Sequence, residues 1–203
     1  MLPAFYPIID TAYLGTVDAD PVEFARLLIN AGVRIAQYRH KGEFTRGRFD
    51  EVDQISKLFN AAEVPFIIND RADIARAVGA AGVHVGQDDL SPVDVRKIIG
   101  PALILGYSTH NADQLAAADS QPVDYLAIGP MFETPSKQNP DPLVGIENLS
   151  DLRKLTTKPL VAIGGISLGR ATEVLDAGAD SLAVISGVVA ENLAAWVRLH
   201  PNR

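Results

Sequence analysis

The sequence predicts an α/β protein made of one (β/α)8 barrel domain with parallel strands over residues 1–203. Three observations lead to this prediction. Eight short apolar runs alternate along the chain with eight segments of helical periodicity. The runs show no regular alternation of apolar and polar residues, as expected for parallel strands that helices cover. The length of 203 residues suits one core and is at the short end of the range for such barrels.

The first half of the chain predicts four strands at residues 5–9, 34–38, 65–68 and 82–85. Helix starts are marked by Asp20-Pro21 and by Thr45, because these residue types cap the free N–H groups of a first turn. Gly32 and Gly79 follow runs of helical spacing and mark helix ends. Each of these strands except the last is therefore followed by a helix within this half.

The second half predicts strands at residues 103–107, 125–128, 160–163 and 181–184. Ser91-Pro92, Asn111 and Ser167 are the expected helix caps. A further helix is expected over residues 145–155, and the last one carries Trp196. The longest irregular segment, residues 130–143, is expected to be a loop that closes over a site.

Composition and charge narrow the class of protein. A net charge of -7 argues against broad nucleic-acid binding, which needs a basic face. The absence of cysteine excludes disulfides, thiolate zinc sites and a cysteine nucleophile. No signal peptide and no apolar stretch of the ~20 residues that span a membrane are present. A cytoplasmic protein that does not bind membranes is predicted, and the sequence leaves open whether it forms a homo-oligomer.

Polar side chains gather where the predicted strands end. In a (β/α)8 barrel the carboxyl ends of the strands form the face that carries the active site. The side chains at these ends are Gln37, Arg39, Lys41, Asn69, Asp70, Asp88, Asp89, Ser108, His110, Thr134, Ser136 and Lys137. We therefore expect them to line one barrel mouth.

Three of these side chains are cations and two are well-placed carboxylates. Arg39, Lys41 and Lys137 together suit a strongly anionic group such as a diphosphate. Asp70 and Asp89 follow neighbouring strands and suit a Mg²⁺ ion that bridges the same diphosphate, because Mg²⁺ prefers oxygen ligands and substrate phosphates.

The turn Gly164-Gly165 before a predicted helix is a candidate site for a single phosphate, since backbone N–H groups point outward there. Structural alternatives stay open for several polar residues. Asp70 and Asp88 would also serve as helix caps, and His84 and His110 as structural histidines. The convergence of several groups, rather than any one of them, favours a functional site.

The chain resembles the thiamine phosphate synthase family over nearly its whole length. The matching stretches are Gln37-Tyr-Arg-His-Lys41, Asn69-Asp70, Gly86-Gln-Asp-Asp89, Gly106-Tyr-Ser-Thr-His110, Gly129-Pro to Lys137, Ile163-Gly-Gly-Ile166 and Val184-Ile-Ser186. One departure is Ser136, where threonine is frequent in the family, and another is Pro135, which stiffens the loop.

The resemblance implies an enzyme that joins 4-amino-2-methyl-5-(diphosphooxymethyl)pyrimidine to a thiazole phosphate with the help of Mg²⁺. The catalytic residues so implied are Arg39, Lys41, Ser108 and Lys137. The metal ligands are Asp70 and Asp89. The substrate-binding residues are Gln37, Tyr38, Arg39, His40, Lys41, Asn69, Ser108, Thr134, Pro135, Ser136, Lys137, Gly165, Ile185 and Ser186.

The mechanism implied by the resemblance is dissociative: diphosphate leaves, a pyrimidinylmethyl cation forms, and the thiazole nitrogen attacks it. Two alternatives stay open. A thiazole tautomerase shares the barrel and uses a histidine for proton transfer, and His110 lies where such a residue would sit. A non-catalytic sensor of phosphate ligands is the other. The combination of Asp70, Asp89, Lys41 and Lys137 favours the synthase.

Overall fold

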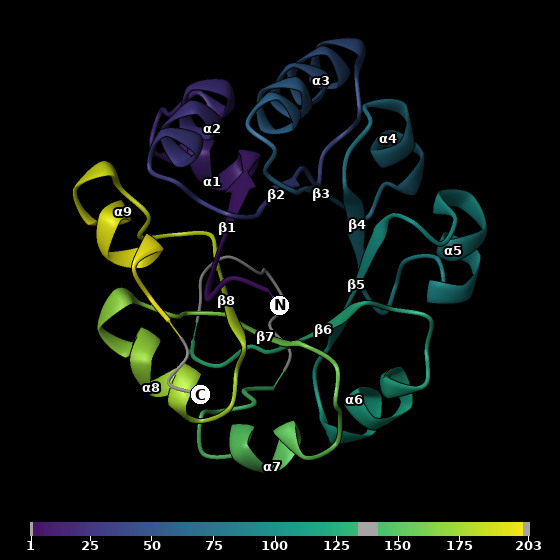
Figure 1. The fold of residues 1–203 in the computed structure, drawn as a ribbon, viewed down its shortest axis with the longest axis vertical. Helices are drawn as coiled ribbons and strands as arrows, with labels where there is room; N and C mark the ends of the chain where they lie inside the picture. Colours follow the sequence, from purple (N-terminus) through teal and green to yellow (C-terminus); the bar gives the residue numbers. More distant parts are fainter. Residues whose placement is uncertain (1, 134–141, 201–203) are drawn as a thin grey trace.

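The computed structural model describes residues 2–133 and 142–200 and contains a closed barrel of eight parallel strands in chain order. Figure 1 shows the barrel nearly end-on, with the helices in a ring around it. This arrangement confirms the fold predicted from the sequence. The strands are β1 (Phe5–Asp10), β2 (Ala36–Arg39), β3 (Phe66–Asn69), β4 (Gly82–Val85), β5 (Ile104–Thr109), β6 (Tyr125–Ile128), β7 (Leu160–Ile163) and β8 (Ser181–Val184).

The helices differ from the sequence prediction in three places. A short helix directly after β1 was not expected. The helix expected over residues 145–155 is shorter, with five residues at 149–153, and the helix after residue 167 begins as a 3-10 helix. The helices are α1 (Thr11–Thr16), α2 (Pro21–Asn30), α3 (Arg46–Ala61), α4 (Ala72–Ala77), α5 (Pro92–Ile99), α6 (Ala112–Asp119), α7 (Leu149–Arg153), η1 (Leu168–Arg170), α8 (Ala171–Asp176) and α9 (Ala190–Val197).

Most predicted caps act as expected. The side chains of Asp20, Thr45, Ser91 and Asn111 accept hydrogen bonds from first-turn N–H groups of α2, α3, α5 and α6. Such a cap satisfies N–H groups that have no partner within the helix. Ser167 precedes η1 but its side chain makes no capping bond. The unexpected helix α1 is capped by Asp10, whose side chain accepts from the N–H of Tyr13 at 2.8 Å.

The side chains of each strand alternate between two apolar layers. The outer layer lies between the barrel and its helices and includes Phe5, Ile9 and Trp196. The inner layer lies within the barrel and includes Tyr6 and Ile8. The alternation follows from the two-residue period of a strand. It decides which residue near a strand end faces the barrel mouth and which faces the helices.

The last helix closes the ring against the first strand. Trp196 of α9 is buried and stacks on Phe5 of β1 with 5.2 Å between the ring centroids. Figure 1 shows α9 beside α1 and α2, so the last helix lies next to the first helices in the ring. Among the helices that the structure describes, none combines the length and the apolar composition of a membrane span.

Candidate active site

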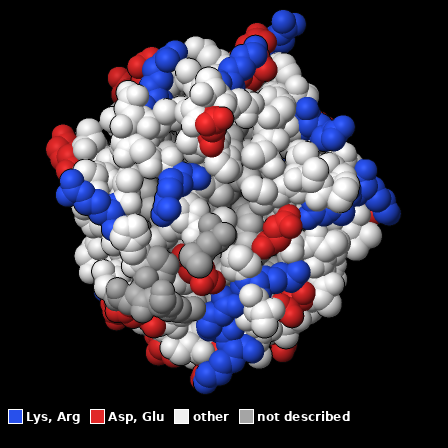
Figure 2. Space-filling model, in the orientation of Figure 1, with Lys and Arg blue, Asp and Glu red and all other residues white. Residues whose placement is uncertain are grey.

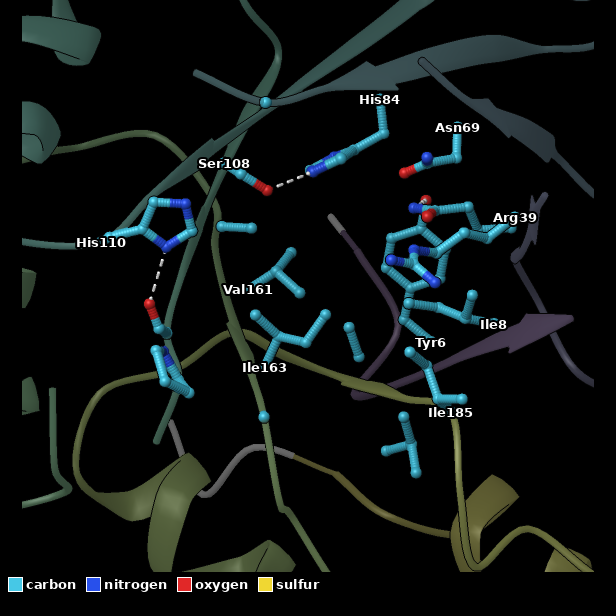
Figure 3. A pocket seen from close by; sticks show the side chains of 18 of the residues that line it. Tyr6, Ile8, Arg39, Asn69, His84, Ser108, His110, Val161, Ile163 and Ile185 are labelled. Atoms are coloured by element: carbon cyan, nitrogen blue, oxygen red, sulfur yellow. Dashed lines mark hydrogen bonds between the residues drawn. The ribbon is translucent and has the colours of Figure 1, made fainter. Parts of the chain in front are cut away.

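A cavity of about 450 Å³ opens at the carboxyl ends of the strands. Figure 3 shows Arg39 and Asn69 on one side of it and His110 on the other, with Val161 and Ile163 between them. The cavity thus has a polar side and an apolar wall. Figure 2 shows basic and acidic side chains interspersed around the rim of one face rather than gathered into a stripe of one sign.

Lysine and aspartate side chains meet on the polar side. Lys41 Nζ lies 2.6 Å from Asp70 Oδ2, and both residues line the cavity. Asp70 has a φ of 63°, a left-handed backbone conformation that places it in a sharp bend after β3. Burial raises the pKa of Asp70, Lys41 opposes this shift, and the nearby Asp89 adds to it. The two predicted metal ligands are therefore close enough to interact.

Asp89 is held in place by its own loop. Its Oδ2 accepts the N–H of Gly86 at 2.7 Å, which fixes the carboxylate beside the end of β4. No group of three or more metal-ligating side chains gathers within residues 2–133 and 142–200. A pair of carboxylates nevertheless fits Mg²⁺, which is usually held by one or two carboxylates and completes its shell with water and substrate phosphates.

A chain of hydrogen bonds crosses the base of the cavity. Gln37 Nε2 donates to Tyr6 Oη at 3.2 Å, and Tyr6 Oη lies 2.9 Å from Tyr125 Oη. Tyr125 Oη lies 2.9 Å from His84 Nδ1, and His84 Nε2 lies 2.8 Å from Ser108 Oγ. Burial lowers the pKa of His84 to about 4, so the imidazole is neutral near pH 7. The chain fixes the Ser108 hydroxyl at the cavity surface.

Asn69 is a further polar residue that lines the cavity. Its side chain is buried and lines the cavity, and within the part of the chain that the structure describes its Nδ2 has no hydrogen-bond partner. A buried polar atom without a partner is costly, and it is expected to find one. An acceptor atom on a bound ligand would satisfy it.

The Gly164-Gly165 turn packs tightly against the loop after β6. The two glycines have φ of 99° and 65°, which other residues rarely adopt. A Cβ on Gly165 would lie 2.5 Å from the carbonyl oxygen of Glu133. Ile185 and Ser186 line the cavity beside this turn. The predicted phosphate-binding residues at these two strand ends therefore share one part of the cavity.

Two predicted substrate-binding residues do not line the cavity. Tyr38 is buried on the helix side of β2, where its hydroxyl donates to Glu51 Oε1 of α3 at 2.7 Å. The two-residue period of the strand explains this position, since the flanking Gln37 and Arg39 face inward. His40 Nδ1 lies 2.7 Å from Thr11 Oγ1 of α1. Neither residue lines the cavity, and a role of Tyr38 and His40 in substrate binding stays a prediction.

The remaining predicted residues fall into two groups. Gln37, Arg39, Lys41, Asn69, Asp70, Asp89, Ser108, Gly165, Ile185 and Ser186 line the cavity. Thr134, Pro135, Ser136 and Lys137 lie outside the described residues, as does most of the loop that was expected to close over the site. His110, which the sequence left between a structural and a catalytic role, also lines the cavity and lies 2.9 Å from the carbonyl oxygen of Gly129 through Nδ1.

Sequence reasoning did not name as site residues three side chains that line the cavity. Tyr6 and Tyr125 lie inside runs that were read as plain apolar strands, and His84 was assigned a structural role. A signal was available in retrospect. Each lies at an inward-facing position, and a polar atom inside a barrel needs a partner there.

Comparison with known proteins supports one family. The sequence pattern described as "Thiamine monophosphate synthase" matches residues 5–188. The chain is 48% identical over 192 residues to the thiamine-phosphate synthase of Koribacter versatilis, covering 94% of this chain and 90% of that protein. It is 39% identical over 189 residues to that of Pelotomaculum thermopropionicum, covering 93% and 87%.

Solved structures give a similar result. The thiamine phosphate pyrophosphorylase from Pyrococcus furiosus superimposes with a TM-score of 0.84 at 30% identity, covering 95% of this chain and 93% of that one. The phosphoribosyl anthranilate isomerase from Thermotoga maritima reaches a TM-score of 0.69 at 11% identity, covering 97% and 98%. The second likeness shows the fold alone.

Proposed function

The chain belongs to the thiamine monophosphate synthase family, and on this premise we propose that it joins a pyrimidine diphosphate to a thiazole phosphate, giving thiamine phosphate and diphosphate. One observation of the structure carries the proposal. Arg39, Lys41 and the carboxylate pair Asp70 and Asp89 converge at one side of a cavity that also has an apolar wall. This charge pattern suits a diphosphate attached to a flat ring better than it suits a monophosphate alone.

The pyrimidine ring would occupy the base of the cavity. Its ring nitrogens and amino group would meet the free Nδ2 donor of Asn69 and the polar groups of Gln37 and Ser108. The apolar wall of Val161 and Ile163 would cover a ring face. Donors placed among apolar side chains are the usual means by which a pocket orients a heterocycle.

Asp70 and Asp89 are the residues that would hold Mg²⁺, which when bound would neutralise charge on the diphosphate oxygens. Lys41 pairs with Asp70 at 2.6 Å in this structure, so the ammonium is already beside the place where a diphosphate would lie. Arg39 adds a planar set of donors that matches phosphate oxygens.

The reaction needs no protein nucleophile. The bond between the methylene carbon and the diphosphate oxygen breaks, and its electron pair leaves with diphosphate. The lone pair of the thiazole nitrogen then forms the new carbon–nitrogen bond. Arg39 and Lys41 would stabilise the charge that develops on the leaving group, and the apolar wall would limit the access of water to the carbon.

The phosphate of the thiazole would lie near Gly165 and Ser186. Gly164 and Gly165 both have a positive φ, and Ser186 follows β8 at the same part of the cavity. Backbone N–H groups in such a turn bind anions without the need for a cation. The two substrates would thus enter one cavity from neighbouring sides.

The experiment is a reconstitution with omissions. Purified protein, Mg²⁺ and both precursors are expected to yield thiamine phosphate and diphosphate, and removal of either precursor is expected to abolish both products. Lys41→Ala is expected to slow turnover by roughly 10²–10³-fold, because it removes stabilisation of the leaving group. His110→Asn is expected to have a smaller effect, since the route needs no general base.

The opposite pattern would refute the proposal. A protein that forms no thiamine phosphate, or one that loses activity with His110→Asn but not with Lys41→Ala, is not a synthase of this kind. The relatives reported above are named as synthases, and none of them supports the tautomerase or sensor alternatives. The cytoplasmic location stays a prediction, and the oligomeric state stays open.

A further inference from the structure

Asp10 is a buried carboxylate at the mouth of the barrel with two separate bonding partners. It is the last residue of β1, 3% exposed, and its Cα pairs with that of Arg39 in the strand register. Its Oδ2 accepts a hydrogen bond from Arg39 Nη1. Its Oδ1 accepts the N–H of Tyr13 and caps α1. One carboxylate therefore links a cavity arginine to the first turn of a helix.

Burial makes this link costly to break. A carboxylate removed from water loses several kcal/mol of hydration, which is recovered only when charged partners and hydrogen bonds replace the water. Arg39 supplies the charge and α1 supplies the N–H group. The Arg39 side chain is itself only 22% exposed. An arginine side chain normally gives up much rotational freedom when it binds a ligand, and the pairing with Asp10 would remove that freedom beforehand.

The same helix also holds the residue that follows Arg39. Thr11 Oγ1 lies 2.7 Å from His40 Nδ1, and the other ring nitrogen of His40 lies 3.2 Å from the carbonyl oxygen of Glu43. The start of α1 thus contacts two consecutive residues at the end of β2. These contacts hold the start of the loop that carries Lys41.

We propose that Asp10 is a positioning residue that orients the Arg39 guanidinium toward an anionic group in the cavity. The inference rests on the proposed function for the identity of that group, a diphosphate. Asp10 does not line the cavity, so it acts through Arg39 rather than by touching substrate. A different role predicts the opposite effect: a carboxylate that only offset the positive charge of Arg39 would weaken diphosphate binding, and its removal would strengthen it.

Asp10→Asn separates these roles. Asparagine keeps a carbonyl oxygen for the N–H of Tyr13, so α1 stays capped, but it loses the charge that holds Arg39. The matched control is Asp20→Asn, since Asp20 caps α2 in the same way through the N–H groups of Val22 and Glu23. Asp10→Ser, which also caps helices, is the second variant should asparagine fail to fold.

The measurements are steady-state kinetics and calorimetric titration with inorganic diphosphate and Mg²⁺. Asp10→Asn is expected to raise the KM for the pyrimidine diphosphate or lower kcat by roughly tenfold, with little change in the KM for the thiazole phosphate. Diphosphate binding is expected to weaken by a similar factor. Asp20→Asn is expected to match the wild type in both measurements.

A double variant tests whether the effect passes through Arg39. In an Arg39→Ala background, Asp10→Asn is expected to leave turnover unchanged and to raise Tm, because it removes a buried carboxylate that has lost its partner. A further loss of turnover in that background would overturn the inference. Tighter diphosphate binding by Asp10→Asn, or kinetics like those of Asp20→Asn, would overturn it as well. A wild-type protein that makes no thiamine phosphate would instead refute the proposed function.

Discussion

Gly106 packs directly against Tyr125 and His84, two members of the hydrogen-bonded chain at the base of the cavity. Gly106→Ala is therefore predicted to disturb this chain. A Cβ at this position in β5 would lie 2.1 Å from Cζ of Tyr125, 2.3 Å from its Oη and 2.4 Å from Nδ1 of His84. Ordinary contacts of a Cβ begin near 3.4 Å. The Tyr125 ring would therefore have to move by roughly 1 Å in a packed interior, which has few voids to receive it.

The expected cost has two parts. Inserting a methyl group into a packed core costs about 1–3 kcal/mol. Tyr125 also bonds Tyr6 and His84 through its hydroxyl at 2.9 Å each, and weakening these bonds adds about 1 kcal/mol. The free energy of unfolding should fall by ~2–4 kcal/mol, which corresponds to a fall in Tm of roughly 5–15 °C for a chain of this size.

Urea unfolding and thermal melts measure this effect directly. The control is Gly47→Ala on α3, where an added Cβ meets nothing within 4 Å. That substitution should stabilise the protein by ~0.5–1 kcal/mol, because alanine is the better helix former. Should Gly106→Ala unfold within about 0.5 kcal/mol of wild type, the Tyr125 ring is not held against β5 as described.

Three further predictions concern pH, the amino-terminal face of the barrel and the metal. Because the folded-state pKa of His84 is about 4, below the ordinary 6.5, the unfolded chain takes up a proton first as pH falls, and stability is lost between those values. His84 should cost the wild-type protein roughly 2 kcal/mol of unfolding free energy between pH 7 and pH 5, and His84→Gln should lack this loss. A variant whose unfolding free energy depends on pH as in wild type would contradict the buried neutral imidazole. Arg96, which is 18% exposed, donates to Asp124 and to the carbonyl oxygens of Gly100, Leu103 and Pro122. Arg96→Lys should cost ~2–4 kcal/mol in chemical denaturation because lysine cannot reach these acceptors, while Arg46→Lys at an exposed pair on α3 should cost under about 0.5 kcal/mol. Asp89→Asn keeps an acceptor for the N–H of Gly86, so Tm should hold within about 2 °C while the Mg²⁺ concentration for half-maximal rate rises at least roughly tenfold. A variant with the Mg²⁺ response of wild type would remove Asp89 from the metal site.

The fold was predictable because its signals are local and repeated. Each strand is a short apolar run, and caps such as Asp20 and Asn111 mark helix starts within two or three residues. The errors were local as well. Helix α1 has six residues and begins directly at the end of β1, so no loop separates the two elements. Its cap, Asp10, directly follows the strand predicted over residues 5–9 and was not expected to cap a helix.

The location of the candidate site was predictable from the sequence, but which side chains point into the cavity was not. Strand ends identify the mouth of a barrel, and most of the charged residues placed there line the cavity. The sequence does not show which of two neighbouring residues points inward, because both faces of a barrel strand are buried and both can be apolar. Tyr38 was named as substrate-binding because it lies within the matching stretch Gln37–Lys41, and its hydroxyl contacts Glu51 of α3.

The pairing register of the strands shows which side chains point into the barrel, which composition alone does not. Arg39 lines the cavity, and its Cα pairs with that of Asp10. Residues two positions earlier on each strand point to the same side, so Gln37 and Ile8 also lie on the inner face of the barrel. The same step places Tyr6 inward. Applied to β3 and β4, where Asn69 pairs with His84, it puts both polar side chains inside the barrel. A polar residue at an inward position must find a partner or a ligand. His84 has found Ser108 and Tyr125, whereas the Nδ2 of Asn69 has no partner among the described residues and is the donor that a substrate would satisfy.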